Sequence, residues 1–427
     1  MVPYPKLVAF DLDGTAWYHW LNGKKFKNLV HHHKKEDNLE PYNHNGHYSV
    51  RDKRNHKNSV TLAADFPRII TELVMRDILI AIVSRNTNKA LCDRALWYFK
   101  ARDPKTKEFR PITDFIKYDE VKDESKQHHF KRIQKWSGLP YYEMLIFDDR
   151  PLNLEVETWE GVTFKLIPHE HQHGMTWNDF IDGIAEWRRN QHLQVPFTQN
   201  PPKLIDPHPN KMLIGYVGTD IPSAKAYASG KRRPFVGKPR PARWGYGLYV
   251  SDNPQVAMFF SQWLRSKDVS KLRVCEIYAR DKDVFMNDLK KIWYWPEHGY
   301  LTNNMHATDD QIGKSQLDRD AHIQKAFHVK KPYILFSRHN YMSDMGKPEY
   351  GLSINPKKRF NEMVIYPQIQ DALMYGTPFS LLNAKKQWKS GKLRKIQYEH
   401  KIKAWKILVP DGTKGDCEKH GEHQFFK

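Results

Sequence analysis

Cysteine is scarce in this chain of 427 residues: only Cys92, Cys275 and Cys417 occur, and they lie far apart. An odd number of widely spaced cysteines argues against a disulfide framework. Because such frameworks are typical of secreted domains, their absence favours a reducing compartment. We therefore expect a cytoplasmic protein, with a nuclear location as the alternative.

Long apolar runs are missing as well. A membrane-spanning helix needs about 20 consecutive apolar residues, and no stretch of this chain approaches that length. The opening residues, Met1 to Lys6, also lack the apolar core of a signal peptide. We therefore expect no membrane partner, and 40% hydrophobic with 28% charged residues is typical of a soluble globular protein.

Acidic residues are scarce only in the second part of the chain. Residues 1–190 carry 30 Lys and Arg against 27 Asp and Glu, a net charge of +3, whereas the remainder carries 39 against 22, a net charge of +17. A strongly basic half beside a near-neutral half predicts a polyanionic partner such as nucleic acid. A surface that merely keeps the chain soluble is the alternative.

The basic charge is concentrated near the end of the chain. Residues 384–406 contain nine Lys and Arg against a single acid, Glu399, and Trp388, Tyr398 and Trp405 lie between them. Aromatic side chains among lysines can stack on nucleic-acid bases. We therefore interpret residues 384–427 as a basic tail that binds nucleic acid.

The first 190 residues alternate apolar strands with helical stretches. We predict strands at 6–10, 79–83, 144–147 and 162–166, and helices at about 64–76, 88–100, 125–137 and 176–189. Continuous apolar strands separated by helices predict a doubly wound parallel sheet of the α/β class.

Chain length and composition suggest further boundaries. A chain of this size is expected to form two or three domains. The prolines of residues 191–211 predict a linker. We predict a first domain at 1–190 with a small cap insert at about 18–60, a second domain at 212–383 and the basic tail after it.

Polar side chains gather where the predicted strands of the first domain end. Asp11 and Asp13 follow the first strand, Ser84 follows the second, and Asp148 and Asp149 follow the third. Open α/β sheets place their sites at this edge. Neighbouring carboxylates repel one another unless a cation lies between them, and oxygen ligands suit Mg²⁺. These four aspartates therefore predict a magnesium site, in which either carboxylate of the last pair completes the metal shell.

These residue types suit the transfer of a phosphoryl group to a carboxylate. Asp11 is the candidate nucleophile and would form an aspartyl-phosphate. Asp13 would protonate the leaving oxygen and then activate water. Ser84, Arg85 and Lys126 are candidates for holding the phosphate, and Lys122 is a near alternative to Lys126.

Four segments resemble, in order, the motifs of the haloacid dehalogenase superfamily: Phe10 to Thr15, Val83 to Asn86, Ser125-Lys126 and Ile146 to Asp149. Further similarity to its magnesium-dependent phosphatase branch lies in Pro5 to Phe10, Ala16-Trp17, Ser49 to Asp52 and Asn153. The resemblance covers about 190 residues. It implies Mg²⁺ as cofactor, a metal contact from the backbone of Asp13, and a phosphorylated small molecule or phosphoprotein as substrate.

Three separated segments of the second domain carry another resemblance: Gly215 to Thr219, Trp244 to Phe260 and Asn361 to Tyr366. They are similar to mono-ADP-ribosyltransferases of the diphtheria toxin, exotoxin A and poly(ADP-ribose) polymerase type. The resemblance implies an α+β domain that binds NAD through the four residues Tyr216, Gly218, Thr219 and Tyr249, with Glu362 as the catalytic carboxylate. That family has a histidine where this chain has Val217, which cannot form the hydrogen bond of the histidine side chain.

The sequence thus favours a phosphatase fused to an ADP-ribosyltransferase-like domain. One alternative is a phosphatase with a non-catalytic basic scaffold or nucleic-acid-binding domain. Another is a structural or assembly protein built from captured enzyme folds. The paired aspartates favour an enzyme for the first domain, whereas Val217 favours a scaffold for the second.

Overall fold

A computed structural model of the chain divides into two compact units, Met1–Gln191 and His192–Lys427, and each is described by itself. The structure describes residues 3–26, 34–44, 47–168, 173–198, 209–230, 243–265, 268–295, 307–339, 360–367, 369–370 and 374–409. Among these residues, no helix is long and apolar enough to cross a membrane.

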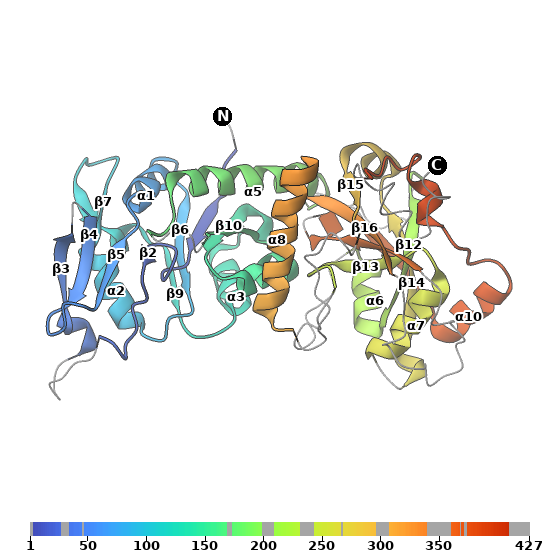
Figure 1. Ribbon diagram of the computed structural model, residues 1–427, viewed down its shortest axis with the longest axis horizontal. Coiled ribbons are helices and arrows are strands. Elements are labelled where there is room, and N and C mark those ends of the chain that lie inside the picture. Colours follow the sequence, from blue (N-terminus) through green and yellow to red (C-terminus); the bar gives the residue numbers. More distant parts are fainter. Residues whose placement is uncertain are drawn as a thin grey trace. The chain divides into compact units, whose positions relative to one another are not determined.

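The first unit is built on a five-stranded sheet in the order β11-β10-β1-β6-β9 (Figure 1). Its strands are β1 (Leu7–Phe10), β6 (Leu79–Ser84), β9 (Tyr118–Val121), β10 (Met144–Asp148) and β11 (Thr163–Leu166). Every pairing is parallel. The predicted α/β parallel sheet is therefore confirmed, and β9 is a strand that the sequence analysis missed.

Four helices lie between these strands, namely α1 (Phe66–Met75), α2 (Lys89–Tyr98), α3 (Lys126–Ser137) and α4 (Glu155–Trp159), and α5 (Trp177–Thr198) follows β11. The start of α3 is fixed by Ser125, whose Oγ accepts a hydrogen bond from Gln127 N at 3.2 Å. Its end is fixed by Gly138 in the left-handed conformation. Helix α5 continues to Thr198, into the segment predicted as a linker, and residues 199–208 lie outside the described part.

The insert between β1 and β6 forms a small antiparallel sheet in the order β2-β5-β4-β3. Its strands are β2 (Trp17–Tyr18), β3 (Leu39–His44), β4 (His47–Asp52) and β5 (Ser59–Leu62). In Figure 1 these strands, in blue, stand beside α2, which contacts β3. A hairpin of β7 (Lys100–Arg102) and β8 (Phe109–Pro111) follows α2.

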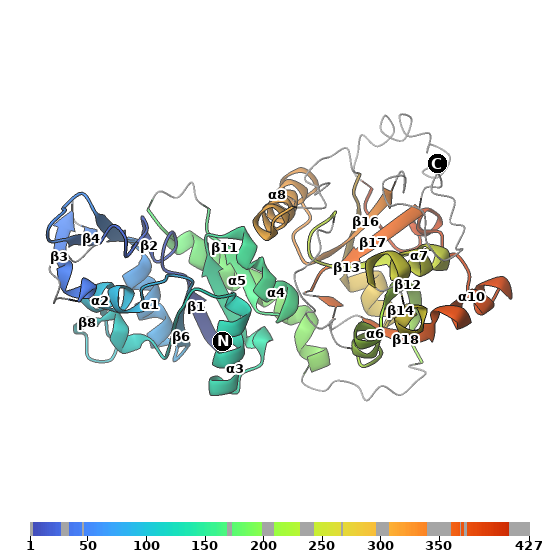
Figure 2. The same ribbon diagram turned by 90° about the horizontal axis from the view of Figure 1, so that it is seen from below.

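The second unit has a seven-stranded sheet in the order β15-β16-β17-β13-β12-β14-β18. Its strands are β12 (Met212–Asp220), β13 (Leu248–Ser251), β14 (Leu272–Ala279), β15 (Lys290–Trp293), β16 (Tyr333–His339), β17 (Phe360–Ile365) and β18 (Met374–Ser380). Only β15 and β16 pair in parallel among them. Its helices are α6 (Ile221–Ala228), α7 (Pro254–Arg265), α8 (Asp309–Phe327) and α10 (Leu381–Lys389), and Figure 2 shows α6 and α7 against β12 and β14.

The end of the described chain packs into the core of this unit. Tyr398 is fully buried and its hydroxyl donates to Ile214 O at 2.8 Å. The ring of Trp405 meets that of Phe285 edge-on, with centroids 5.1 Å apart. The prediction that Tyr398 and Trp405 stack on bases is therefore wrong, because these aromatic side chains point inward while the lysines between them stay at the surface.

This packing predicts a large stability difference between two neighbouring substitutions. Trp405 is 5% exposed, so Trp405→Ala should destabilise the second unit by about 3–5 kcal/mol. Leu408 is 42% exposed, and Leu408→Ala should change stability by less than about 0.5 kcal/mol. Urea denaturation of the full chain measures both, and equal midpoints would contradict the packing of Trp405.

Candidate active site

The chain reverses direction within the parallel sheet beside β1. From β1 it proceeds to β6 and β9 on one side, and then returns to β10 and β11 on the other. Such a reversal opens a crevice at the carboxyl ends of the two central strands. Asp11 directly follows β1 and Asp148 ends β10, so the crevice is flanked by carboxylates.

Three carboxylates converge in this crevice. Asp11, Asp148 and Asp149 are all buried, and each offers one oxygen within 4.8 Å of the others. Gly14 makes room for this arrangement, because a Cβ there would lie 2.5 Å from Asp149 Oδ2. Its φ of +77° also favours glycine. A cluster of carboxylate oxygens is a donor set that fits Mg²⁺.

Lys126 places a positive charge in contact with this cluster. Its Nζ lies 3.0 Å from Asp11 Oδ2 and also contacts Asp148, and its side chain is fully buried. Burial alone would lower the pKa of Lys126, but the charges of Asp11 and Asp148 outweigh it and raise the pKa. Lys122 is exposed and pairs with Glu124 at 3.1 Å. Of the two candidate lysines, the structure thus brings Lys126 to the aspartates.

Hydrogen bonds fix the orientation of Asp148. Asn153 Nδ2 donates to both of its carboxylate oxygens, at 3.0 and 2.9 Å, and Arg150 N donates at 2.8 Å. Burial raises the pKa of Asp148 and of Asp149, and the charge of Asp11 adds to both shifts. The convergence of three carboxylates concentrates negative charge that a divalent cation can neutralise.

Asp13 lies outside the carboxylate cluster. Its carboxylate accepts hydrogen bonds from Trp17 Nε1 at 2.8 Å, Leu21 N at 2.8 Å and Asn86 Nδ2 at 2.7 Å. Burial raises the pKa of Asp13 to about 6, although these donors oppose the shift. Asp13 as a side-chain metal ligand therefore does not fit this geometry, whereas proton transfer does. Its partners Trp17 and Asn86 were not predicted from the sequence.

Ser84 and Arg85 stand at the carboxyl end of β6, which pairs with β1. Ser84 is buried, and its Oγ accepts from Asn86 N at 3.3 Å. Arg85 is more exposed, and its guanidinium lies 3.8 Å from Asp123 in the loop before α3. The structure therefore brings both residues to the sheet edge that carries the aspartates.

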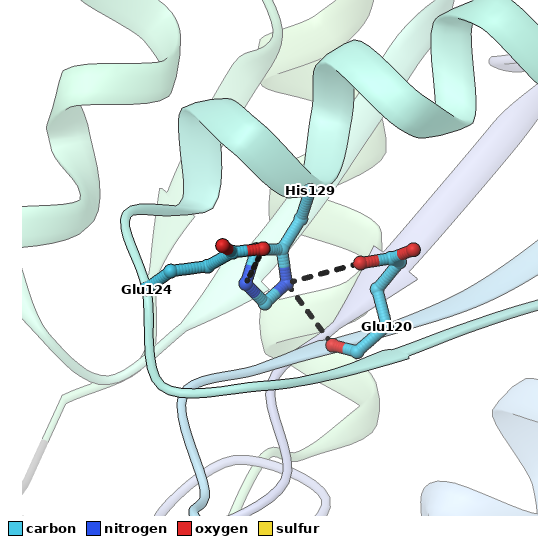
Figure 3. A group of neighbouring side chains, drawn as sticks. All are labelled: Glu120, Glu124 and His129. Atoms are coloured by element: carbon cyan, nitrogen blue, oxygen red, sulfur yellow. Dashed lines mark hydrogen bonds and ion pairs between the residues drawn. The ribbon is translucent and has the colours of Figure 1, made fainter.

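A second cluster of possible ligands, Glu120, Glu124 and His129, lies at the start of α3 (Figure 3). His129 Nδ1 is 3.0 Å from Glu120 O, and burial lowers the pKa of His129 to about 4. Arg132 forms ion pairs with both glutamates, and Lys122 pairs with Glu124. Because these cations already neutralise the carboxylates, we assign this cluster to holding α3 in place rather than to a metal.

Four of the predicted NAD-binding and catalytic residues share one face of the second sheet. Tyr216 pairs with Ser251, and Ser251 pairs with Glu362. Because side chains alternate along a strand, Gly218 on β12 and Tyr249 on β13 lie on the same face as these residues. Thr219 is buried on the opposite face, so the structure does not bring its side chain to the other four.

These residues hold the local structure together. Glu362 is buried and accepts a hydrogen bond from Trp244 Nε1 at 2.7 Å. Burial raises the pKa of Glu362. The hydroxyl of Tyr249 accepts from Trp244 N at 2.6 Å and donates to Gly245 O at 3.0 Å. A Cβ at Gly218 would clash with the backbone of α7, so this glycine permits the helix to approach β12.

The comparisons with known proteins concern a phosphatase family. The Acid Phosphatase family model matches residues 3–190. A HAD-like hydrolase superfamily protein of Schizosaccharomyces pombe is 31% identical over 163 residues, which are 38% of this chain and 86% of that protein. Magnesium-dependent phosphatase 1 of Homo sapiens is 27% identical over 192 residues, which are 45% of this chain and 92% of that protein.

One similar solved structure is the N-terminal part of a Bacteroides fragilis protein containing a phosphatase domain complexed with Mg, at 18% identity and a TM-score of 0.28. The match covers 43% of this chain and 40% of that chain, so this chain spans less than two thirds of it. A similarity this low supports no structural argument. The ADP-ribosyltransferase resemblance gains no support from these comparisons and stays a prediction.

Buried carboxylates predict how stability depends on pH. Burial raises the pKa of Asp13 to about 6 and raises those of Asp148 and Asp149, whereas an aspartate in the unfolded chain has a pKa of about 3.9. The folded chain therefore binds protons more tightly, and its stability falls as pH rises through the folded-state values. In EDTA, the midpoint of thermal unfolding should thus be lower at pH 8 than at pH 6.

Substitution of one carboxylate tests the origin of that effect. Asp149→Asn should raise the metal-free midpoint of the first unit at pH 8 by a few degrees, since about 1 kcal/mol corresponds to about 2–4 °C for a unit of this size. It should also reduce the stabilisation by added Mg²⁺. Asp77→Asn, at an exposed carboxylate of the same unit, is the control. Unchanged pH dependence in Asp149→Asn would refute the explanation.

Proposed function

Because this chain belongs to the HAD-like hydrolase superfamily, we propose that its first unit is a magnesium-dependent phosphomonoesterase that works through an aspartyl-phosphate at Asp11. One observation carries the proposal: the buried ammonium of Lys126 lies beside the converging carboxylates of Asp11, Asp148 and Asp149. This arrangement combines a nucleophile, a cation site and a positive charge. Mg²⁺ held by these three carboxylates would shield the nucleophile from the charge of the phosphate.

In the first step Asp11 attacks phosphorus, and the bond between phosphorus and the leaving oxygen breaks. Lys126, 3.0 Å from Asp11, would keep the nucleophile oriented and neutralise charge on the phosphoryl oxygens. Ser84 and Arg85 would hold the remaining oxygens. Protonated Asp13 gives its proton to the leaving oxygen, for which a pKa raised to about 6 is suited.

In the second step water attacks phosphorus, and the bond to Asp11 breaks to release phosphate. Asp13, now a carboxylate, takes the proton from that water. Its donors Trp17, Leu21 and Asn86 stabilise the charged form between the steps. One carboxyl group thus serves as acid and then as base. The proposed substrate is a phosphorylated small molecule or a phosphoprotein.

Substitution of Asp11 and of Asp13 should block different steps of the reaction. Asp11→Asn should abolish turnover of 4-nitrophenyl phosphate, because no phosphoenzyme can form. Nitrophenolate leaves without a proton, so Asp13→Asn should release a first equivalent of nitrophenolate and then stall. Steady-state turnover should fall about 10²–10⁴-fold. Rapid-quench kinetics with Mg²⁺ measures both phases, and Asp77→Asn is the control. A burst from Asp11→Asn would refute the assignment of the nucleophile.

A second proposal concerns the basic surface formed by α10 and the residues that follow it. Lys386, Lys389 and Lys392 are exposed, whereas the neighbouring Tyr398 is inside the core. Contacts through lysine alone reach phosphate groups and do not read bases. We therefore propose weak binding to nucleic acid or another polyanion, dependent on salt and independent of sequence.

Charge reversal tests this surface without disturbing the core. The triple variant Lys386→Glu, Lys389→Glu and Lys392→Glu should weaken binding of a mixed-sequence DNA duplex and reduce the salt slope by about 1 per lysine. A matched triple reversal of the exposed Lys24, Lys25 and Lys57 in the first unit is the control. Equal binding by both triple variants would contradict the proposal.

NAD binding by the second unit is the third proposal. It is supported by the shared sheet face of Tyr216, Gly218, Tyr249 and Glu362. Val217 replaces the histidine of the resembling family, so affinity should be poor, in the millimolar range. Glu362→Gln should abolish nicotinamide release, whereas Glu276→Gln, at a half-buried carboxylate on β14, should not. If calorimetry detects no NAD binding at millimolar concentration, the scaffold alternative stands.

A further inference from the structure

We propose that Glu155, at the start of α4, is a positioning residue that holds Lys126 in the active site. This inference rests on the proposed phosphatase function, in which Lys126 supports the nucleophile. Glu155 belongs to none of the motifs found in the sequence. It is part of neither the carboxylate cluster nor the hydrogen bonds around Asp13.

Glu155 forms hydrogen bonds with the residues on both sides of Lys126. Its Oε1 accepts a hydrogen bond from Ser125 Oγ at 2.6 Å, and its Oε2 accepts one from Gln127 Nε2 at 3.0 Å. Glu155 and Gln127 are buried, at 8% and 3% exposed. Hydrogen bonds to a carboxylate are about twice as strong as neutral ones. The residues that flank the lysine are therefore fastened to one side chain of another helix.

The bond to Ser125 also orients the cap of α3. A serine hydroxyl has one proton and two lone pairs. Because its proton points to Glu155, a lone pair is left for Gln127 N, which donates to Ser125 Oγ at 3.2 Å. This capping bond sets the residue at which α3 begins. Glu155 thereby fixes the first turn of the helix, where Lys126 lies.

The same short segment also orients the partner of the lysine. Asn153, two residues before Glu155, donates to both oxygens of Asp148, and Asp148 contacts Lys126. The segment 153–155 thus positions both partners of the ion pair between Lys126 and Asp148. Lys126 lies 3.0 Å from Asp11, and a misplacement of about 1 Å at a reacting group can cost about 10²-fold in rate.

A purely structural role for Glu155 makes different predictions. As a mere link between α3 and α4, it should be equivalent to Glu160, which pairs with Lys131 of α3 at 3.4 Å. Glu160 is also largely buried, with 11% of its side chain exposed. It follows the same helix α4 but contacts the middle of α3 rather than its first turn. Glu160→Gln is therefore the matched control for Glu155→Gln.

The experiment is a double-mutant cycle on the full chain with Mg²⁺. Glu155→Gln, which loses one acceptor but keeps its shape, should lower kcat for an aryl phosphate about 10–100-fold and weaken binding of orthovanadate. Glu160→Gln should leave both unchanged at a similar midpoint of unfolding. In the Lys126→Met background, Glu155→Gln should cause no further loss of vanadate affinity, because the residue through which it acts is gone.

The results separate the two hypotheses. Equal kcat for the two glutamate variants, or an undiminished effect of Glu155→Gln in Lys126→Met, would overturn the positioning role while the wild type stays an active phosphatase. A wild type that neither turns over the aryl phosphate nor binds vanadate would overturn the proposed function and this inference together. If Lys126→Met does not fold, the cycle is run with Ser125→Ala, whose effect on kcat should likewise not add to that of Glu155→Gln.

Discussion

The ion pairs of Lys126 with Asp11 and Asp148 are the interactions on which the first unit depends. A fully buried ammonium is tolerated only beside opposite charge, and here it stands among three carboxylates that it cannot neutralise alone. Burial raises the pKa of Asp148 and Asp149, so ionisation of these carboxyl groups lowers the free energy of unfolding of the metal-free protein. The same negative charge favours binding of a divalent cation, and with it a phosphate. The carboxylates that serve the proposed function therefore lower the stability of the metal-free protein.

The two units use buried carboxylates in different ways. In the first unit they converge, and their mutual repulsion creates a demand for a cation. Among the described residues of the second unit, the buried carboxylates accept from neutral donors: Glu362 accepts from Trp244 at 2.7 Å, and Asp252 accepts from Asn361 at 2.8 Å. Asn361 also donates to Glu399, which forms an ion pair with Arg338. Among the described residues, three aspartate carboxylates thus converge only in the first unit.

The sequence predicted the central strands well because they are buried on both faces and read as continuous apolar runs. It missed β9, Tyr118–Val121, an edge strand that carries two acids. The grouping of polar residues at strand ends followed from topology, but the orientation of Asp13 depends on Trp17 and Asn86, which lie in other segments. Lysine-rich composition suggested a separate tail, whereas inward aromatics such as Tyr398 attach its described part, up to residue 409, to a core.

The central claim is that the phosphoryl group is transferred to the carboxylate of Asp11 before water releases it as phosphate. An acyl phosphate reacts with hydroxylamine to give a hydroxamate, whereas a free carboxylate does not. During turnover of an aryl phosphate with Mg²⁺, hydroxylamine should therefore modify Asp11, and mass spectrometry of the peptide that contains it should detect the product. Hydrolysis that proceeds without modification of Asp11, or with modification of Asp13 or Asp148 instead, would contradict the account.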